Sequence, residues 1–351
     1  MRILIATDAW HPQVNGVVRS LTMMAEAARG FGVEVAFLTP QSFRTFAMPS
    51  YPDLRLALPM PSKIASLIAD LQPDSIHIAT EGPIGLLTRR YCRRQGLPFT
   101  TSFHTRFPEY ISARLPIPES WIWTALRAFH GASQAVMAAT PALAGELRGR
   151  GFRNVVLWPR GVDTGEFHPR PVYLGLPRPV FLCVGRVAVE KNLEAFLDLD
   201  LPGTKLIVGD GPARRELAAK YPQAVFWGAR QGEALAQAYA GADVFVFPSR
   251  TDTFGLVLLE ALASGLPVAA FPVTGPRDVI GTAPVGALDE DLRRACLTAL
   301  TISRQACLDF AAKHTWEAPA RAFVENIANA SLLDPKSDEM QFALKHPGVI
   351  A

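Results

Sequence analysis

The sequence has no hydrophobic run long enough to cross a membrane. No apolar stretch reaches the about 18–20 residues that span a bilayer. The start, MRILIATD, has one basic residue and an apolar run too short for a signal peptide. Both absences predict a protein that works in the cytoplasm, with peripheral attachment to the inner face of the plasma membrane as an alternative.

Cysteine is scarce as well. The chain has four cysteines, and their spacing does not resemble a metal-binding motif. Free thiols suit a reducing compartment, in agreement with a cytoplasmic location. The sequence also lacks the complete G-x-G-x-x-G fingerprint, which argues against a conventional nicotinamide-dependent enzyme. No internal repeat of solenoid period is present.

The chain has material for two domains. Its 351 residues are 49% hydrophobic and 19% charged, which suits two domains of about 150–180 residues each. Residues 1–165 hold 17 Lys and Arg against 11 Asp and Glu, whereas the remainder holds 18 against 21. Much of the basic excess comes from RRYCRRQG (89–96), four arginines on a short helix. This segment is either a solvated helix end or a surface for an anionic partner.

Apolar runs that alternate with amphipathic helices predict parallel sheets covered on both faces. In each half of the chain five or six strands are expected, and the pattern starts afresh after 159–179, a segment rich in proline and glycine that predicts the linker. Two doubly wound domains predict a cleft, with ligands at the carboxyl ends of the strands. The expected strands are 3–7, 33–38, 75–78, 99–102, 135–138, 155–157, 180–184, 205–208, 224–227, 244–246 and 267–269; expected helices include 16–29, 141–149, 212–220 and 232–240.

Several residues of the first half follow predicted strands. Gly16 opens a helix whose backbone N–H groups can approach an anion, although a tight turn without a ligand would also explain it. His104 in FHTRFPEY follows the strand at 99–102 and is expected to point into the cleft. Trp121 and Trp123 lie two residues apart, so they cannot share one helical face. They form either an apolar rim that touches lipid or ordinary packing.

The second half carries two cations beside a strand end. FLCVGRVAVEKN (181–192) places Arg186 and Lys191 five residues apart before a helix. Two cations in this position can clamp a diphosphate. The alternative is a surface ion pair with Glu190. In LIVGDGPARREL (206–217), Gly209 and Gly211 permit a tight bend between a strand and a helix.

Two acids occur in TDTFGLVLLEALASGLPVAA (251–270), which is otherwise apolar or small. A helix is expected to begin near Phe254 or Gly255, with its unpaired N–H groups and positive dipole exposed. Glu260 would lie about 8–9 Å along the axis at 1.5 Å per residue. Asp252, Glu260 and the helix start would then surround a space suited to a sugar nucleotide. Alternatively, Asp252 caps the helix and Glu260 pairs with a buried cation.

GRVAVEKN, VGDGP and PSRTDTFGLVLLEALASGLPVAA, in this order, resemble the retaining family-4 glycosyltransferases of GT-B fold. NGVVRSL, FHTRFPEY and PRGVDTGEFHP in the first half agree, and the resemblance runs from Met1 to about Ala330. The form TDTFGLVLLEA with FHTRFPEY is most similar to the branch of sulfoquinovosyl-diacylglycerol synthase and the lipid glucosyl- and mannosyltransferases. The implied architecture is two Rossmann-like domains facing across a cleft: residues 1–160 for the acceptor, 161–316 for the nucleotide sugar, and a helix and tail at 317–351 that cross back to the first domain.

The resemblance also implies roles for residues. Arg186 and Lys191 would bind the donor diphosphate, and Glu260 would hold the ribose as the second acid of the family's E-x7-E motif. Asp252 stands where the family usually has Glu, so its shorter side chain is expected to alter which donor hydroxyls are read. The catalytic set is therefore His104, Asp252, Arg186 and Lys191; the donor set adds Gly16, Thr253, Phe254, Gly255, Leu256 and Glu260; Glu81, Trp121 and Trp123 are guesses for the acceptor.

These inferences predict a retaining hexosyltransferase that uses a UDP- or GDP-sugar as co-substrate and needs no metal or other cofactor. The expected acceptor is a membrane lipid at an anionic surface, and no nucleic acid is involved. A soluble or polysaccharide acceptor, an epimerase of the same fold and a non-catalytic nucleotide-sugar-binding module stay open as alternatives. The nucleotide base, the sugar, the acceptor and the oligomeric state are not specified by the sequence.

Overall fold

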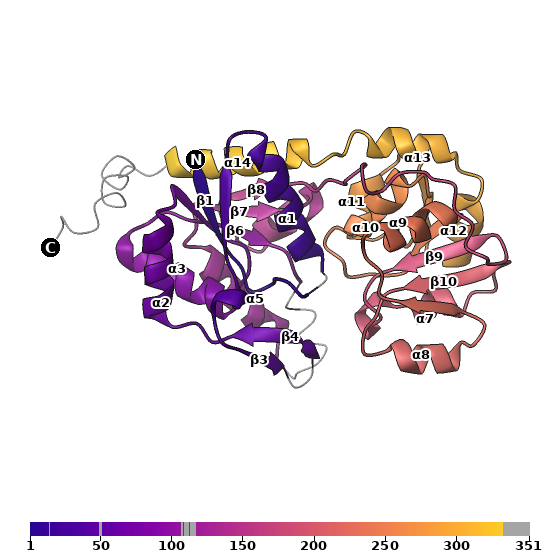
Figure 1. Cartoon of the computed structure of the whole chain (residues 1–351), viewed down its shortest axis with the longest axis horizontal. Helices are drawn as coiled ribbons and strands as arrows, with labels where there is room; N and C mark the ends of the chain where they lie inside the picture. The colour runs from indigo at the N-terminus through magenta and orange to yellow at the C-terminus, as the bar shows by residue number, and fades with distance from the viewer. Residues whose placement is uncertain (14, 49–50, 107, 109–111, 113–116, 333–351) are drawn as a thin grey trace. The chain divides into compact units, whose positions relative to one another are not determined.

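The computed structural model describes residues 1–13, 15–48, 51–106, 108, 112 and 117–332 (Figure 1). The chain divides into two compact units. The first comprises Met1–Pro159 and the segment that starts at Glu317, and the second comprises Arg160–Trp316. Each unit is built around a six-stranded parallel sheet, which confirms the predicted α/β class.

The first unit has the strand order β2-β1-β5-β6-β7-β8, with all neighbours parallel. Its central strands read as continuous apolar runs because both faces of the sheet are covered; Ile3, Leu4 and Ile5 are fully buried. The strands are β1 (Arg2–Ala6), β2 (Glu34–Leu38), β5 (Ser75–Ile78), β6 (Thr100–Phe103), β7 (Ala135–Ala138) and β8 (Val155–Leu157). The helices are α1 (Gly16–Arg29), η1 (Pro40–Ser42), α2 (Pro61–Leu71), α3 (Pro83–Gln95), α5 (Glu119–His130), α6 (Pro141–Gly149) and α14 (Glu317–Leu332).

Helix α14 lies in the first unit, although it follows the second unit in sequence (Figure 1). It packs beside α1. The ring of Phe323 lies 4.7 Å from the ring of Trp158 and 4.9 Å from that of His77. Asn326 also donates a hydrogen bond of 2.8 Å to the carbonyl of Leu157 at the end of β8. The buried aromatic contacts and this hydrogen bond hold the returning helix on the first unit.

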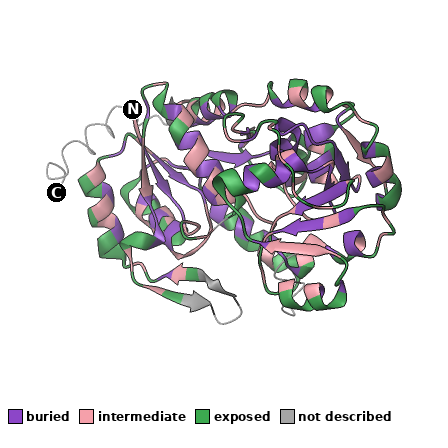
Figure 2. Cartoon of the chain, turned by 45° about the vertical axis from the view of Figure 1, so that its right-hand side comes forward, coloured by how far each residue is buried: buried purple, intermediate pink, exposed green. Residues whose placement is uncertain are grey.

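The second unit has the strand order β11-β10-β9-β12-β13-β14, again parallel throughout. The inner strands of this sheet are largely buried, whereas the two edge strands are mostly half-buried, and Figure 2 shows these classes in purple and pink. The strands are β9 (Val180–Val184), β10 (Thr204–Val208), β11 (Val225–Gly228), β12 (Val244–Phe247), β13 (Val268–Ala270) and β14 (Gly286–Leu288). The helices are η2 (Val189–Lys191), α7 (Glu194–Leu197), α8 (Arg214–Lys220), α9 (Gly232–Gly241), α10 (Leu256–Ala263), α11 (Thr274–Ile280), α12 (Leu292–Ala299) and α13 (Arg304–Ala311).

Three strands were not predicted from the sequence. The antiparallel hairpin of β3 (Thr45–Met48) and β4 (Tyr51–Ala57) belongs to the first unit and carries Pro52, which disfavours a strand assignment because proline cannot donate to the ladder. Strand β14 has only three residues, and its pairing with β13 depends on tertiary contacts that local sequence does not encode.

The segment predicted as a linker, 159–179, contributes to the core of the second unit. Val162 and Phe167 are buried there, and the ring of Phe167 lies 5.4 Å from that of Tyr239. Val162 forms a parallel bridge with Thr315. A Cβ on Gly161 would lie 2.7 Å from the backbone of Thr315, so only glycine allows this approach. The first part of the segment, up to Phe167, is therefore packed on the second unit, whereas 168–179 are exposed or half-buried.

Candidate functional site

The second unit has its topological switch point between β9 and β12. These strands are neighbours in the sheet but not in sequence, and the strands before and after them run toward opposite edges. In open parallel sheets the loops that leave such a pair diverge and create a ligand-binding crevice at the carboxyl ends. Arg186 and Lys191 follow β9, and Asp252 follows β12. The fold thus places these three predicted residues in the loops that follow the two strands of the switch point.

Glycines shape the loop that carries the cations. A Cβ on Gly209 would lie 1.8 Å from the carbonyl oxygen of Gly185, and a Cβ on Gly211 would lie 2.4 Å from that of Val187. Both distances are far shorter than the van der Waals contact between a carbon and an oxygen atom. The loop after β10 can therefore pack against the loop after β9 only if both positions are glycine. The backbone N–H of Val187 donates a hydrogen bond of 2.9 Å to the backbone carbonyl of Asp210, which joins the two loops.

Two hydrogen bonds and one ion pair connect the turn η2 and the residue after it to the loop after β12. The Asn192 side chain donates to the carbonyl of Pro248 at 3.0 Å, while its backbone is left-handed, with φ 53°. Thr251 donates to the carbonyl of Glu190 at 3.4 Å. Lys191 Nζ lies 2.5 Å from Asp252 Oδ1. These contacts fix the position of Lys191 relative to Asp252.

Each predicted cation has an acidic neighbour. Arg186, whose side chain is half exposed, forms an ion pair with Glu190, the pair that the sequence offered as an alternative to a diphosphate clamp. Lys191 pairs with Asp252, with side chains 26% and 18% exposed. This second pair was not predicted. The other carboxylate oxygen of Asp252 is buried and accepts no hydrogen bond from the described part of the chain.

Helix α10 begins at Leu256, one residue after the predicted range. Its N-cap is Gly255 in the left-handed conformation, with φ 85°, and no side chain caps the helix. Asp252 is therefore not the helix cap, which removes the alternative explanation for it. Thr253, Phe254, Gly255 and Leu256 are all half-buried, and Gly275 allows the loop to pass, since a Cβ there would lie 3.0 Å from the carbonyl of Phe254.

Glu260 lies inside α10 and is 5% exposed. The hydroxyl of Tyr239 on α9, itself fully buried, donates to its Oε2 at 2.9 Å. A buried carboxylate needs hydrogen-bond donors to offset the cost of desolvation. Tyr239 and Asn192 were both missed from the sequence. Asn192 directly follows Lys191 and is a residue type that tolerates a left-handed backbone, which is a usable signal; Tyr239 has no local signal.

The first unit has its own switch point, between β1 and β5, and an acid follows each strand. Asp8 after β1 accepts hydrogen bonds from the N–H groups of Ile84 and Gly85, at 2.8 and 3.2 Å, at the start of α3. Burial raises the pKa of Asp8. A Cβ on Gly82 would lie 2.4 Å from this carboxyl group. Asp8 therefore serves as a long-range cap of helix α3.

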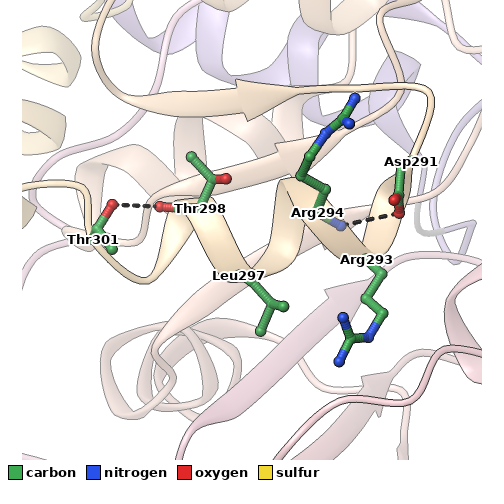
Figure 3. Close-up of a pocket in the computed structure, with 6 residues that line it drawn as sticks. All are labelled: Asp291, Arg293, Arg294, Leu297, Thr298 and Thr301. Atoms are coloured by element: carbon green, nitrogen blue, oxygen red, sulfur yellow. Dashed lines mark hydrogen bonds between the residues drawn. The ribbon is translucent and has the colours of Figure 1, made fainter.

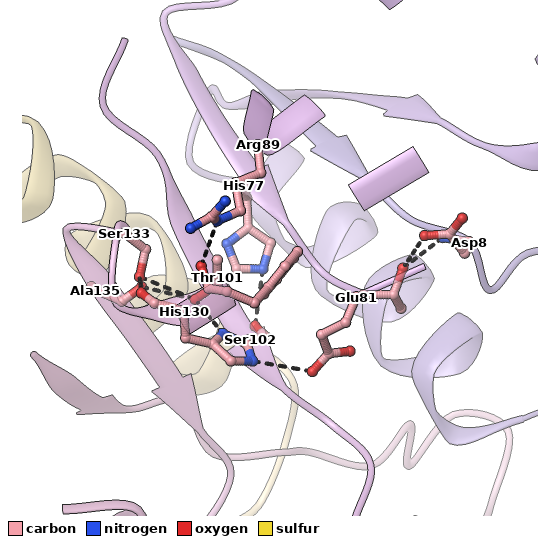
Figure 4. Close-up of polar contacts among 11 residues, drawn as sticks. Asp8, His77, Glu81, Arg89, Thr101, Ser102, His130, Ser133 and Ala135 are labelled. Carbon is pink, nitrogen blue, oxygen red and sulfur yellow. Dashed lines mark hydrogen bonds and ion pairs between the residues drawn. The ribbon is translucent and has the colours of Figure 1, made fainter. Parts of the chain in front are cut away.

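Glu81, the acid after β5, belongs to a different network (Figure 4). Its Oε1 lies 3.1 Å from Nε2 of His130, whose Nδ1 lies 2.9 Å from Oγ1 of Thr101. Thr101 in turn contacts Ser133 at 3.2 Å. The His130 side chain is fully buried, whereas that of Glu81 remains 10% exposed. Both ring nitrogens of His130 are engaged, so the ring fixes the orientation of the carboxylate that was guessed to bind the acceptor.

The other first-unit residues are dispersed. Gly16 is the first residue of α1, which Asn15 caps through 3.0 Å hydrogen bonds from Val17 and Val18. His104 follows β6, half-buried, with its ring 5.7 Å from that of Trp158. FHTRFPEY extends past it into positions 107 and 109–110, which lie outside the described residues.

The two predicted rim tryptophans differ in exposure. Trp121 is 72% exposed, whereas Trp123 is 5% exposed and stacks on Phe103 with ring centroids 5.9 Å apart. The guanidinium of Arg150 covers the Trp123 ring at 4.0 Å. Trp123 is therefore a core residue, as the packing alternative proposed. The idea of an apolar rim depends on Trp121 alone.

Across the described ranges, no three His, Cys, Asp or Glu side chains are grouped as a metal site. The sequence has two D-x-D triplets, at 198–200 and 289–291. Asp198 accepts a hydrogen bond from the hydroxyl of Tyr221, and Asp289 pairs with Arg294.

No helix within the described part of the chain is long and apolar enough to span a bilayer.

A hollow on the outer face of α12 contains none of the predicted residues (Figure 3). It is lined by Asp291, Arg293, Arg294, Leu297, Thr298 and Thr301. Asp291 Oδ1 accepts the N–H of Arg294 as the helix cap, and Thr301 donates to the carbonyl of Thr298. Arg293 donates to the carbonyl of Asp200 and Arg294 pairs with Asp289, so these polar groups already have partners within the unit.

Two family models match the chain. The model described as Glycosyltransferase Family 4 matches residues 14–166, and the model described as Glycosyl transferases group 1 matches residues 178–301. The chain is 33% identical over 307 residues to the GDP-mannose-dependent alpha-mannosyltransferase of Mycobacterium tuberculosis, covering 80% of this chain and 81% of that protein. It is 35% identical over 258 residues to the sulfoquinovosyl transferase SQD2 of Arabidopsis thaliana, covering 68% and 50%. It is 27% identical over 347 residues to the alpha-monoglucosyldiacylglycerol synthase of Streptococcus pneumoniae, covering 86% and 78%.

Solved structures show the same fold. Sucrose-phosphate synthase from Thermosynechococcus elongatus superposes with a TM-score of 0.77 at 20% identity, covering 95% of this chain and 100% of that one. Anabaena HepE in complex with UDP and glucose gives a TM-score of 0.68 at 15% identity, covering 94% and 100%. These likenesses identify a GT-B fold of two Rossmann-like units. The 33% identity to a mannosyltransferase over 80% of the chain, with the match to the family model, shows that the chain belongs to glycosyltransferase family 4.

Proposed function

We propose that this glycosyltransferase moves a hexose from a UDP- or GDP-sugar to an acceptor hydroxyl with retention of the anomeric configuration and without a metal ion. The observation that supports this most directly is the grouping of Arg186, Lys191 and Asp252 at the β9/β12 switch point. Cations there suit the diphosphate, and the open start of α10 adds N–H groups of favourable polarity.

The proposed chemistry is a front-face displacement. The bond between the anomeric carbon and the leaving diphosphate oxygen breaks, and the acceptor oxygen bonds to the same face of the sugar. The acceptor proton passes to the departing diphosphate oxygen. Arg186, Lys191 and the α10 dipole would stabilise the negative charge that grows on that oxygen, the role that a metal plays in other transferases. Glu260 would hold the ribose hydroxyls.

The test of donor use begins with ligand-dependent thermal unfolding. UDP- and GDP-sugars are screened for a rise in the unfolding midpoint, since only a ligand that binds the folded state raises it. Product formed from the selected donor is then analysed by NMR for its anomeric configuration, before and after addition of a chelator. An inverted product would refute retention, and loss of activity with the chelator would refute metal independence.

The clamp itself is tested by substitution. Arg186→Ala and Lys191→Ala are each expected to lower turnover about 10²- to 10³-fold, because preorganised charges contribute this much when they face developing charge. Arg215→Ala on α8, also an exposed arginine of the second unit, is the matched control and is expected to act like the wild type. Near-normal turnover in both clamp variants would remove the assignment.

For the acceptor we propose a membrane lipid at an anionic surface. One support is the name of a relative, alpha-monoglucosyldiacylglycerol synthase. Two others are the exposed side chain of Trp121 and the arginines of helix α3. Of the four α3 arginines, Arg89 is used internally, since it donates to the carbonyl of Phe129 at 2.7 Å. The other three are exposed.

Vesicle binding tests this surface. The wild type is expected to float with phosphatidylglycerol vesicles and much less with phosphatidylcholine vesicles, since each basic residue near an anionic surface contributes about 1 kcal/mol. Gln substitution of the three exposed α3 arginines is expected to abolish the difference. Equal flotation of this variant and the wild type would exclude α3 as the lipid surface.

A further inference from the structure

The contact between Lys191 and Asp252 has a consequence for which ligands the donor site prefers. The Nζ of Lys191 and the Oδ1 of Asp252 lie 2.5 Å apart, and both side chains are about three-quarters buried or more. The hydrogen bonds from Asn192 and Thr251 hold the two loops together around this pair. The residue proposed for the diphosphate is thus neutralised by the residue proposed for the sugar.

This arrangement sets two anions in competition for one cation. A diphosphate that approaches Lys191 meets the Asp252 carboxylate beside it, and like charges at such distances repel. Asp252 also has a buried oxygen without a hydrogen-bond partner among the described residues, so it is incompletely satisfied even while paired. Sugar hydroxyls are donors that can satisfy both of its oxygens.

We infer that Asp252 makes the donor site select the intact sugar nucleotide over the nucleoside diphosphate that remains after transfer; this rests on the proposed function. The diphosphate of either ligand takes Lys191 and displaces the carboxylate. With an intact donor, the sugar hydroxyls then donate to the freed Asp252 and recover the lost interaction. With the spent nucleoside diphosphate, Asp252 stays uncompensated next to a phosphate. The pair thereby favours donor entry and release of the spent nucleotide.

Glu190 provides the internal comparison. It pairs with Arg186, so it also competes with an incoming diphosphate. It lies on η2, four residues after Arg186, and no sugar-binding role is proposed for it. Removing its charge should therefore favour every diphosphate ligand alike, whereas removing the charge of Asp252 should favour only the ligands that lack a sugar.

The experiment measures affinities by calorimetry with four probes: UDP, GDP, UDP-glucose and GDP-mannose. In Asp252→Asn, the affinity for the nucleoside diphosphate that the wild type binds is expected to rise about 3- to 30-fold, as removal of one charge a few ångströms from a phosphate implies. Affinity for the matching sugar nucleotide is expected to stay or fall. Glu190→Gln is expected to raise both affinities by a similar factor. Asp252→Glu keeps the charge, so its affinity for the nucleoside diphosphate is expected to stay near that of the wild type.

The possible results distinguish failure of the proposed selection by Asp252 from failure of the proposed donor site. Weaker nucleoside diphosphate binding in Asp252→Asn, or an unchanged ratio of the two affinities, overturns the selection while the donor site stands. If the wild type binds none of the four probes, the proposed donor site fails, and the selection fails with it. Because Asp252→Glu keeps the charge, an equal change of the nucleoside diphosphate affinity in Asp252→Glu and Asp252→Asn would also overturn the inference.

Discussion

The buried contact between Tyr239 and Glu260 gives a quantitative prediction about the stability of the second unit. Tyr239→Phe removes one hydroxyl and leaves the packing of the ring in place. The hydroxyl donates at 2.9 Å to a carboxylate that is 5% exposed, and water cannot replace it without opening the core. A hydrogen bond to a charged group contributes about 1.5–3 kcal/mol. We therefore expect the free energy of unfolding to fall by about 2 kcal/mol.

In a unit of this size, 1 kcal/mol corresponds to about 2–4 °C in the unfolding midpoint. The variant is thus expected to unfold about 4–8 °C below the wild type in scanning calorimetry, without ligand. Tyr173→Phe is the matched control, because Tyr173 is 85% exposed in the same unit. Its effect is expected to stay within about 0.5 kcal/mol.

A double-mutant cycle identifies the cause. If the loss arises from the Glu260 charge, neutralising it in Tyr239→Phe/Glu260→Gln should recover part of the stability, with a coupling energy of about 1 kcal/mol or more. Equal midpoints for Tyr239→Phe and Tyr173→Phe would refute the reasoning, as would strict additivity in the cycle.

Three further predictions concern other parts of the chain. Burial raises the pKa of the thiols of Cys92, Cys183, Cys296 and Cys307 to about 12. A thiol reagent at pH 8 should therefore label none of the four in the folded protein and all four after denaturation, and rapid labelling of any one in the folded protein would contradict this. Gly209→Ala should destabilise the second unit by more than 2 kcal/mol in urea unfolding, because its Cβ would collide with the Gly185 carbonyl; Gly145→Ala, in open space within α6, should be neutral or slightly stabilising, and similar effects of the two would be inconsistent with the contact. His130→Phe should raise the acceptor KM of the transferase about 10-fold or more with little change in slow donor hydrolysis, and His130→Gln should rescue it in part, since an amide can still donate to Glu81; equal loss of both reactions would indicate a purely structural role.

Much of the sheet architecture was predictable because buried parallel strands are continuous apolar runs. The strand at 75–78 and the helices at 16–29 and 141–149 occur as the sequence predicts. Helix starts were predictable where a residue enforces them, as at Pro141, but α10 begins later than expected because Gly255 adopts a left-handed backbone. The hairpin β3–β4 was missed because its proline argues against a strand.

The sequence by itself determined the α/β class and which residue types follow which strands, since apolar periodicity and turn chemistry are local properties. Arg186, Lys191, Asp252 and Glu260 could be selected on that basis as candidate residues, and the resemblance to the family-4 glycosyltransferases implied their roles at the donor. Only the tertiary structure decided their partners: Lys191 with Asp252, 61 positions apart, and Glu260 with Tyr239, 21 positions apart. The strand order that makes β9 and β12 neighbours arises from packing of the whole unit, and no local pattern in the chain encodes it.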